Sequence, residues 1–313
     1  MKETRTLHFY TGFSRLKLFL ALSRTPHGLL DMCTPALCAL LWLGALPPLG
    51  TILLGLVTTF AGYTAVYALN DVVDYRVDRR KVQRDGFRES ENYLDALLVR
   101  HPMAHGYISY AEGLCWMLAW STVALWGAYL LNPVCILIFI AGCTLEVTYC
   151  LLLKVSHLRV LVSGGVKTSG GVAAIFAVDP YPSPVFVVLV FFWLFFWEIG
   201  GQNIPNDWAD IEEDPHQDAR TLPVRLGPER ATEVILVSLA LTLLLAAGLF
   251  SFAPGGFHPI FVLASVLTGA GLLVHPALKL YRGKTRSQAI GLFNRASYYP
   301  PALLLVVLAR MAF

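Results

Sequence analysis

Long apolar runs alternate with short polar segments along almost the whole chain of 313 residues. A helix that crosses a membrane needs about 20 predominantly apolar residues, and nine runs are close to that length. The pattern therefore predicts an all-α integral membrane protein with nine transmembrane helices. The predicted spans are His27–Ala45, Gly50–Asn70, Tyr107–Leu131, Pro133–Leu153, Arg159–Val178, Pro184–Asn206, Thr232–Phe252, Phe257–Leu280 and Ser287–Phe313.

The connections between these runs are of two kinds. One kind is short and contains no Lys or Arg. The other is polar and, with two residues at helix borders, contains 21 of the 24 Lys and Arg residues. Because loops rich in Lys and Arg stay on the cytoplasmic side, we expect the N-terminus in the cytosol and the C-terminus outside. The basic set comprises the N-terminus, 71–106, 154–158, 207–231 and 281–286, with Arg159 and Lys279.

Composition supports a membrane protein. Hydrophobic residues make up 56% of the chain and charged residues 14%, against about 25% charged residues in soluble domains. This excludes an ordinary soluble enzyme and a disordered chain, and the absence of a basic stripe with aromatic residues argues against nucleic-acid binding. We expect one multi-pass domain, 1–313, in a bacterial inner membrane. The cytosolic loops 71–106 and 207–231 would then cap its site.

Two segments share the pattern N-D-x-x-D-x-x-x-D, 136 residues apart, at the ends of the second and sixth predicted spans. Four helices separate the copies, so both face the cytosolic side, and an internal repeat of four helices is indicated. We call them the first and second acidic motifs. The first consists of Asn70, Asp71, Asp74 and Asp78, and the second of Asn206, Asp207, Asp210 and Asp214.

Positions four apart on a helix drift by only about 40° and rise by about 6 Å. Each motif should therefore present one stripe with an amide and two carboxylates. Two converging stripes repel unless a cation lies between them, and Mg²⁺ held by carboxylates and substrate phosphates fits best. The alternative is a solvated helix end with ordinary surface acids. Candidate metal ligands are Asn70, Asp71, Asp74, Asp78, Asp207, Asp210 and Asp214.

Six charged residues lie inside predicted spans, where a charge at mid-membrane costs about 2.5–3.5 kcal/mol. By helix direction all six fall in the cytosolic half, so they predict a polar cavity that opens to the cytosol below the acidic motifs. Structural ion pairs are the alternative. The residues are Asp31, Glu112, Glu146, Lys167, Glu198 and Arg295.

Basic residues accompany the acidic ones. Arg24 starts the first span, and Lys154 and Arg159 follow the fourth. Cations at the rim of a cavity suit the oxygens of a diphosphate that Mg²⁺ leaves free. Gly165 and Gly170 have the spacing of a phosphate-binding loop, but the Lys-Ser/Thr pair of that motif is missing. The paired glycines there favour close helix packing instead.

These motifs resemble those of the UbiA-type intramembrane prenyltransferases, of the 4-hydroxybenzoate polyprenyltransferase kind. The resemblance rests on Arg24, on both acidic motifs and on the segment 220–227, Arg-Thr-Leu-Pro-Val-Arg-Leu-Gly. The chain departs from the family pattern in two places. Tyr149 and Lys154 are five residues apart, not four, and the loop 79–106 is longer than usual.

The resemblance implies nine helices around a central cavity and a Mg²⁺-dependent transfer of a prenyl group from a polyprenyl diphosphate. The transfer would pass through an allylic carbocation to a small-molecule or lipid acceptor, which we expect to be an aromatic quinone precursor. Lipid and phosphoribosyl substrates remain alternatives within the family. It implies catalytic roles for Asp74, Asp78, Asp210 and Asp214, and diphosphate binding by Arg24, Lys154, Arg159, Asn70 and Asn206.

Two other classes stay open at this point. A divalent-cation transporter could use repeated acidic residues, but transporters place their charges near the midplane of inverted repeats. A lipid-binding protein without catalysis would not need a second acidic motif. The roles of His101 and His105 in the long loop are left open.

Overall fold

The computed structural model describes residues 13–84, 94 and 98–312, and within these ranges it contains helices and no strand. The first half comprises α1 (Phe13–Leu22), α2 (Thr25–Asp31), α3 (Cys33–Leu43), α4 (Leu49–Arg84), α5 (Tyr110–Leu131), α6 (Pro133–Leu151), η3 (Leu152–Lys154) and α7 (Arg159–Val178). The second half comprises α8 (Pro184–Trp197), η4 (Glu198–Asn203), α9 (Ile204–Ala209), η5 (Asp214–Gln217), α10 (Leu222–Phe252), α11 (Pro259–Gly269), η6 (Ala270–Val274), α12 (His275–Gly283), α13 (Arg286–Ser297) and α14 (Tyr299–Ala312).

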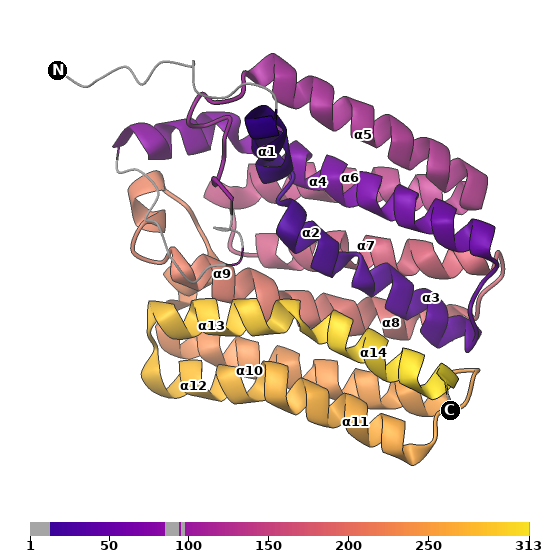
Figure 1. Ribbon diagram of the computed structural model, residues 1–313. Helices are drawn as coiled ribbons and strands as arrows, with labels where there is room; N and C mark the ends of the chain where they lie inside the picture. Colours follow the sequence, from indigo (N-terminus) through magenta and orange to yellow (C-terminus); the bar gives the residue numbers. More distant parts are fainter. Residues whose placement is uncertain (1–12, 85–93, 95–97, 313) are drawn as a thin grey trace.

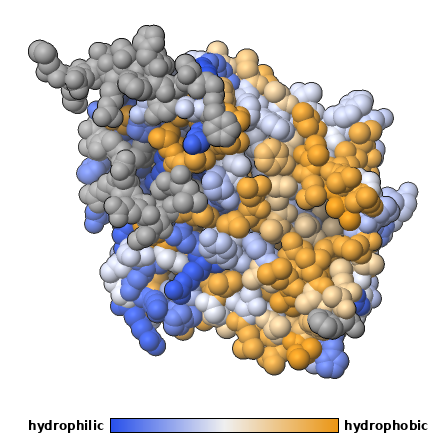
Figure 2. Space-filling view, viewed as in Figure 1, coloured by the Kyte–Doolittle hydropathy of each residue, from blue (hydrophilic) through white to orange (hydrophobic). Residues whose placement is uncertain are grey.

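The long helices lie side by side with their axes roughly parallel (Figure 1). Helix α7 packs against α3, α6 and α8, so it lies inside the bundle, while α4 packs mainly against α5. Figure 2 shows hydrophilic residues gathered at one end of the bundle and hydrophobic residues over most of the remaining face. The far end of α4 and helix α9 lie at that hydrophilic end, so both acidic motifs do as well.

Seven helices within the described ranges are long and apolar enough to cross a membrane. They coincide with the second to eighth predicted spans. The first and ninth predicted spans are each divided in two, α2–α3 at Met32 and α13–α14 at Tyr298. Pro35 and Pro300 explain the breaks, because a proline has no N–H for the carbonyl four residues earlier. The number of nine crossings therefore stays a prediction.

Two helices are longer than the sequence pattern predicted. Helix α4 has 36 residues and continues from the expected end at Asn70 to Arg84. The segment 71–84 contains no Gly or Pro, and Arg79 donates a hydrogen bond to the Tyr75 hydroxyl one turn earlier, at 2.8 Å. Helix α10 begins at Leu222, before the expected Thr232, and is kinked at Gly227. The segments 71–106 and 207–231, expected as loops, are thus partly helical.

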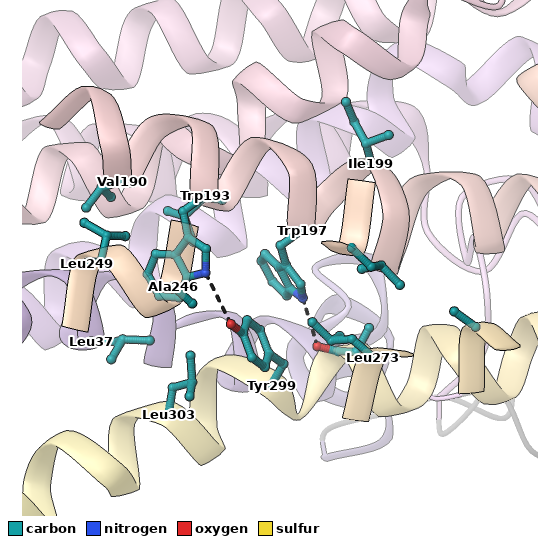
Figure 3. Packing of buried hydrophobic residues seen from close by; sticks show 14 of the residues in the cluster. Leu37, Val190, Trp193, Trp197, Ile199, Ala246, Leu249, Leu273, Tyr299 and Leu303 are labelled. Carbon is teal, nitrogen blue, oxygen red and sulfur yellow. Dashed lines mark hydrogen bonds between the residues drawn. The ribbon is translucent and has the colours of Figure 1, made fainter. Parts of the chain in front are cut away.

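A cluster of buried aromatic residues joins α8 to the last two helices (Figure 3). The indole N–H of Trp193 donates to the hydroxyl of Tyr299 at 3.3 Å, and that of Trp197 donates to the carbonyl of Ala296 at 3.1 Å. All three aromatic side chains are at most 1% exposed. The cluster therefore anchors α8 to α13 and α14, just before the chain enters the segment that carries the second acidic motif.

Glycines allow α7 to approach α8 closely. A Cβ atom added at Gly164 would lie 2.5 Å from Cδ2 of Phe195, and one added at Gly171 would lie 2.4 Å from Cδ1 of Leu194. Both distances are shorter than carbon atoms tolerate, so any larger residue would push the helices apart. This agrees with the packing role that the sequence suggested for these glycine pairs.

Two π-helices interrupt the long helices, and the apolar pattern of the sequence predicts neither of them. Helix η4 (Glu198–Asn203) joins α8 to α9, and η6 (Ala270–Val274) joins α11 to α12. In each case a proline follows two residues later, Pro205 and Pro276. A proline leaves the carbonyl four residues earlier without its usual donor, and a wider π turn accommodates the disturbance.

Candidate active site

The first acidic motif lies on the uninterrupted helix α4, so Asn70, Asp74 and Asp78 share one face as expected. The Asn70 amide group joins three elements. Its Nδ2 donates to Oε1 of Glu146 at 2.6 Å and to Sγ of Cys150 at 3.3 Å, while its Oδ1 accepts from Nη2 of Arg24 at 3.1 Å. These bonds hold α4 against α6 and against the start of α2.

Asp71 lies beside this face and is 3% exposed. Its Oδ1 is 3.6 Å from Nη2 of Arg24 and 3.1 Å from Nδ1 of His101. The same His101 nitrogen is 3.0 Å from Oδ2 of Asp78. Burial by itself lowers the pKa of His101, but the carboxylates of Asp78 and Asp71 outweigh it and raise that pKa to about 9. His101 therefore carries a positive charge at neutral pH.

Arg24 and His101 share an uncommon backbone conformation. Their φ angles are +43° and +49°, in the left-handed region that residues other than glycine rarely adopt. Both side chains contact Asp71; Arg24 precedes the first motif in the sequence, and His101 follows it. Backbone strain of this kind is concentrated at functional sites, and here it marks the two residues that contact the same buried carboxylate.

The second acidic motif does not form the helical stripe that its spacing predicted. Asn206 and Asp207 lie on α9, which ends at Ala209; Asp210 caps that helix, and Asp214 begins the short helix η5. Pro215 explains the difference, because it disfavours helical conformation at Asp214 and offers no N–H to the carbonyl of residue 211. The prediction of a second continuous stripe was wrong.

The two motifs nevertheless face each other. Nζ of Lys81, one turn beyond Asp78 on α4, is 3.4 Å from Oδ2 of Asp210 and 3.0 Å from Oε2 of Glu213. Arg286 of α13 approaches Asp210 from another side, at 4.0 Å. Lys81 therefore links the helical first motif to the non-helical end of the second.

Arg159 forms a second link, deeper in the bundle. This arginine is 6% exposed, and its charge interacts with both Asp74 and Asp207. Its guanidinium carbon lies 3.9 Å from the centre of the Tyr149 ring, a cation–π contact. Its Nε has no hydrogen-bond partner among the described residues. A buried cation thus lies between the two acidic motifs with a donor still available.

Two carboxyl groups of the second motif are buried. Asp207 is 6% exposed, and its Oδ2 has no hydrogen-bond partner in the described part of the chain. Oδ2 of Asp214 accepts a hydrogen bond from Oγ1 of Thr221 at 2.7 Å. Burial raises the pKa of Asp214 to about 6; the Thr221 hydrogen bond opposes that shift, and the nearby Asp210 carboxylate adds to it. Buried carboxyl groups in this arrangement call for a cation.

A cavity of about 390 Å³ begins next to the motifs. Asn70, Asn206 and Arg24 line one end of it, and Leu46 and Thr51 line the other. Thr51 and Asn70 are separated by roughly 28 Å along the axis of α4. The cavity therefore extends from the acidic motifs through most of the thickness of a hydrocarbon core.

Four of the six charged residues predicted inside the spans line this cavity: Asp31, Glu146, Lys167 and Glu198. The other two do not belong to it. Glu112 caps the start of α5 through Ser109 and pairs with Arg15, and Arg295 is exposed on α13.

A model of the UbiA prenyltransferase family matches residues 32–298. The chain belongs to this family. A UbiA homologue from Aeropyrum pernix K1 superimposes with a TM-score of 0.70 at 19% identity, covering 91% of this chain and 98% of that one. A UbiA homologue from Archaeoglobus fulgidus bound to GPP and Mg²⁺ has a TM-score of 0.67 at 17% identity, covering 95% and 100%.

A third structure, described as digeranylgeranylglyceryl phosphate synthase, has a TM-score of 0.67 at 16% identity and covers 96% of this chain and 100% of that one. No curated protein sequence gives a significant match. At such low identity the structural likeness shows a shared fold. The UbiA fold is thus present along almost the whole chain.

Lys154 is the predicted diphosphate-binding residue that the structure places apart from the rest. Its side chain is 41% exposed, its Nζ lies 3.9 Å from Oδ2 of Asp218, and it lines a separate small pocket that Lys81 also borders, outside the long cavity. Arg159 occupies the interior position beside Tyr149 instead. In this UbiA protein, the altered spacing between Tyr149 and Lys154 accompanies a lysine that points away from the cavity.

Two contacts of the site were not deduced from the sequence. Lys81 is one of the basic residues of segment 71–106, and its position three residues after Asp78 places it on the same helix face, but the sequence does not indicate its contacts with Asp210 and Glu213. Thr221, which binds Asp214, gave no sequence signal, because only the tertiary fold brings the two together. His105 stacks on Tyr107 at 5.5 Å between ring centres, and so supports the loop that carries His101.

Proposed function

We propose that this UbiA-family protein is a Mg²⁺-dependent prenyltransferase that moves a prenyl group from a polyprenyl diphosphate to an acceptor. The observation that carries the proposal is the meeting of the two acidic motifs, linked by Lys81 and Arg159, at one end of a long cavity. The basic residues and the cation site at this end suit a diphosphate headgroup, and the remaining, mostly apolar part of the cavity suits a prenyl chain.

The residues present fit a divalent cation. Oδ2 of Asp207 is buried without a partner, and the carboxyl group of Asp214 is buried beside Asp210. Hard oxygen ligands of this kind suit Mg²⁺, and Mg²⁺ would supply stabilisation of the negative charge that develops on the leaving diphosphate. The Archaeoglobus fulgidus homologue was determined with GPP and Mg²⁺ and with DMAPP and Mg²⁺. We propose as ligands Asp74, Asp78, Asp207, Asp210 and Asp214, with Asn70 and Asp71 beside them.

Arg24 and Arg159 would bind the diphosphate oxygens. Arg24 lines the cavity and already touches Asn70, and Arg159 has a buried donor to spare. Charge-assisted hydrogen bonds from guanidinium groups are among the strongest contacts to phosphate. We assign to Arg159 the role that the family resemblance suggested for Lys154. Asn206, which lines the same end, would contribute an amide group.

Aromatic rings below the headgroup would stabilise the allylic carbocation and exclude water. Tyr63 and Tyr67 stack along α4 with ring centres 6.4 Å apart, and Phe293 contacts His27 at 5.3 Å. All four line the cavity. An aromatic acceptor would also pack against such rings, which supports an aromatic quinone precursor over a lipid or phosphoribosyl acceptor.

We further propose that α2–α3 and α13–α14 cross the membrane despite their breaks, which gives nine crossings around a central cavity. Both pairs run alongside the seven continuous spans in Figure 1. With nine crossings, the basic connections place the N-terminus and the acidic motifs in the cytosol and the C-terminus outside. The four-helix repeat and a bacterial inner membrane complete this topology, and the cavity then opens to the cytosol.

A transfer assay tests the proposal. Purified protein, Mg²⁺, labelled GPP and a panel of acceptors should release diphosphate and give a prenylated product. The variants Asp74→Ala and Asp210→Ala should lose about 10³-fold or more in rate, because each removes charge stabilisation of the transition state. Glu229→Ala, at an exposed glutamate, serves as control. Full turnover by both aspartate variants would disprove the mechanism, and metal flux into proteoliposomes would favour a transporter.

A further inference from the structure

We infer that the polar cluster in the middle of the cavity binds the head of the acceptor, that this head is uncharged and bears a hydroxyl group, and that Glu198 takes its proton. This inference rests on the proposed function and specifies the second substrate. We call the cluster the head site; it consists of Asp31, Ser163, Lys167, Glu198 and Asn203, all of which line the cavity. None of the acidic-motif residues belongs to it.

The depth of the head site suits an acceptor. Ser163 and Lys167 lie one and two turns along α7 from Arg159, or roughly 6 and 12 Å. Arg159 marks the level of the acidic motifs, because its charge interacts with Asp74 and Asp207. A nucleophile held beside Ser163 and Lys167 would therefore lie deeper in the cavity than a diphosphate bound at the level of Arg159.

Asp31 is already engaged by several donors. Its Oδ2 lies 2.6 Å from Nζ of Lys167 and also accepts a hydrogen bond from the Tyr67 hydroxyl. Its Oδ1 lies 3.7 Å from Nε2 of His27. Lys167 of the head site and the neighbouring His27 thus both contact the same carboxylate.

Glu198 is different. Its Oε1 accepts a hydrogen bond from Oγ of Ser163 at 2.7 Å, but its Oε2 is buried and has no hydrogen-bond partner within the described residues. Asn203, on the same π-helix, donates to the Tyr149 hydroxyl at 2.9 Å. Its Oδ1 is also buried and has no hydrogen-bond partner among the described residues. The two residues are 8% and 5% exposed. Buried acceptors without donors are unfavourable, so these two oxygens call for a ligand that donates hydrogen bonds.

Both residues line the cavity, and the π-helix brings them to one side of the chain. Helix η4 begins at Glu198 and ends at Asn203. With the wider π turn, residues five apart fall on nearly the same face, whereas in an α-helix they would be about 140° apart. Such turns are frequent at functional sites. Here the turn presents two acceptor oxygens to one ligand.

Charge decides which head fits. Two carboxylates, Asp31 and Glu198, share the site with Lys167 and His27, and both of these contact Asp31. Lys167 and His27 also act on Glu198, so the cationic groups of the site are already shared between two carboxylates. A carboxylate or phosphate on the acceptor would add a further negative charge to this buried site, where like charges repel. A hydroxyl group instead donates to Oε2 of Glu198 and meets no such repulsion.

The chemistry balances with Glu198 as the base. The bond between C1 of the prenyl group and the diphosphate oxygen breaks, and its electron pair leaves with diphosphate. An electron pair of the acceptor forms the new bond to C1. The proton that the acceptor loses moves to Oε2 of Glu198 and passes to water when the product leaves. Proton transfer to a positioned base typically contributes about 10²–10⁴-fold in rate.

Two probes of the same ring test the head class. Labelled GPP with Mg²⁺ is supplied together with either 1,4-dihydroxybenzene or 4-hydroxybenzoate, which differ in one substituent, a hydroxyl or a carboxylate. Binding of each probe to the wild-type protein is measured by calorimetry in the presence of Mg²⁺ and diphosphate. We expect the uncharged probe to bind and react at least about tenfold better, since one unfavourable charge contact reaches that size. Equal or better use of 4-hydroxybenzoate, or no binding of 1,4-dihydroxybenzene, overturns the inference.

Glu198→Gln tests the base. We expect prenyl transfer to fall by about 10²-fold or more, while Mg²⁺-dependent binding of labelled GPP stays within about twofold because the motifs are intact. The preference against 4-hydroxybenzoate should weaken in the same variant. Glu229→Gln, the same change at an exposed position, should match the wild type. Undiminished transfer by Glu198→Gln overturns the role of this residue.

Ser163→Ala provides a second variant in case Glu198→Gln does not fold. Ser163 is a positioning residue, since it orients the carboxylate through one hydrogen bond. Its loss should lower kcat by about tenfold with unchanged GPP binding, and an unchanged kcat would contradict the arrangement. Failure of the proposed function looks different: GPP then shows no Mg²⁺-dependent binding and no diphosphate is released with any acceptor. Efficient prenylation of 4-hydroxybenzoate alone would leave that function standing and remove only the inference about the head.

Discussion

The two acidic motifs have the same spacing but different backbones. The first lies on one straight helix, where its residues share a face and are held by Arg24, Glu146 and His101. The second follows a π-helix and is cut by a helix end at Ala209. The two motifs therefore have the same residues at the same spacing but different backbone conformations. What the motifs share is their meeting point, not their local structure.

The difference has a local cause in the sequence. Prolines flank the second motif at Pro205 and Pro215, and the first motif has none within α4. One proline accompanies the π turn before the motif, and the other ends helical conformation within it. Backbone breaks therefore orient the side chains of the second motif, whereas a regular helix orients those of the first. The following variants test this contrast.

Pro205→Ala should have the largest effect. Restoring an N–H at this position favours a regular α-helix in place of η4, and one residue of register turns a helix by about 100°. Asn206 or, on the other side, Glu198 would then leave the cavity, and Asp207 would turn away from Arg159. Misplacement of this kind costs about 10²-fold in prenyl transfer. Steady-state kinetics with labelled GPP measures it.

Pro276→Ala is the matched control, because Pro276 stands in the same relation to the second π-helix, η6, which lies away from the acidic motifs. We expect this variant to keep most of its activity. Equal losses in the two proline variants would mean that the π turn before the second motif has no special role.

Lys81→Met should come next. It removes the cation between α4 and the end of the second motif, where Asp210 and Glu213 contact it. Breaking a buried ion pair is strongly destabilising, and we expect transfer to fall by about tenfold, or about 1.4 kcal/mol. Arg80→Met is the control, since Arg80 is exposed and bonds only to the backbone of its own helix in the contacts described. Identical kinetics of both variants would show that Lys81 does not align the motifs.

His101→Gln should have a smaller effect, confined to the first motif. The variant loses the charge that holds residues 98–106 over Asp71 and Asp78. Hydrogen exchange in this segment should become faster, and transfer should fall by only a few-fold, because α4 holds its own carboxylates in place. His105→Gln, which alters a ring stack and not an ion pair, is the comparison. Unchanged exchange at 98–106 would argue against a role of His101 in closing the site.

Thr221→Val should have the smallest effect and should act on the second motif alone. The Thr221 hydroxyl stabilises the charged form of Asp214, so its loss should cost about 1–2 kcal/mol of stability. Because the pKa of Asp214 is about 6, this contribution is present above that pH and is lost as the pH falls through it. Thermal unfolding in EDTA across this range measures the difference. Thr232→Val, which removes a hydroxyl bonded within its own helix, should show no such pH dependence.

Much of the fold was predictable from the sequence. The membrane class, seven of the spans and the family follow from apolar runs and from the repeated acidic spacing, and the structure and the family match confirm them. Helix breaks inside α2–α3 and α13–α14 were missed, because apolar patterning does not register the effect of Pro35 or Pro300 on hydrogen bonding. The extension of α4 beyond the first acidic motif to Arg84 was not predicted, because a run of charged residues is typical both of a loop and of an exposed helix.

The site was predictable in its residue types more than in its contacts. The acidic residues and Arg24 were predicted from spacing and position, and the structure brings the two motifs together, while the roles of these residues stay a prediction. The outward position of Lys154, the bond from Thr221 to Asp214 and the pairing of Asp31 with Lys167 depend on distant segments. Such contacts have no periodic signature, so only the tertiary fold reveals them.

The π turn also shifts the numbering between the two helices that lead into the acidic motifs. A π turn takes up one residue more than an α turn. Glu198 lies eight residues before Asn206, and Tyr63 lies seven residues before Asn70. Because of the extra residue in the π turn, the two side chains are at about the same distance along the helix axis from their motifs. Both line the same cavity, and each has a buried side-chain oxygen without a partner among the described residues. If the chain contains the proposed four-helix repeat, an alignment of its two copies would need a one-residue gap, and the phenol of Tyr63 in one copy would correspond to the carboxylate of Glu198 in the other.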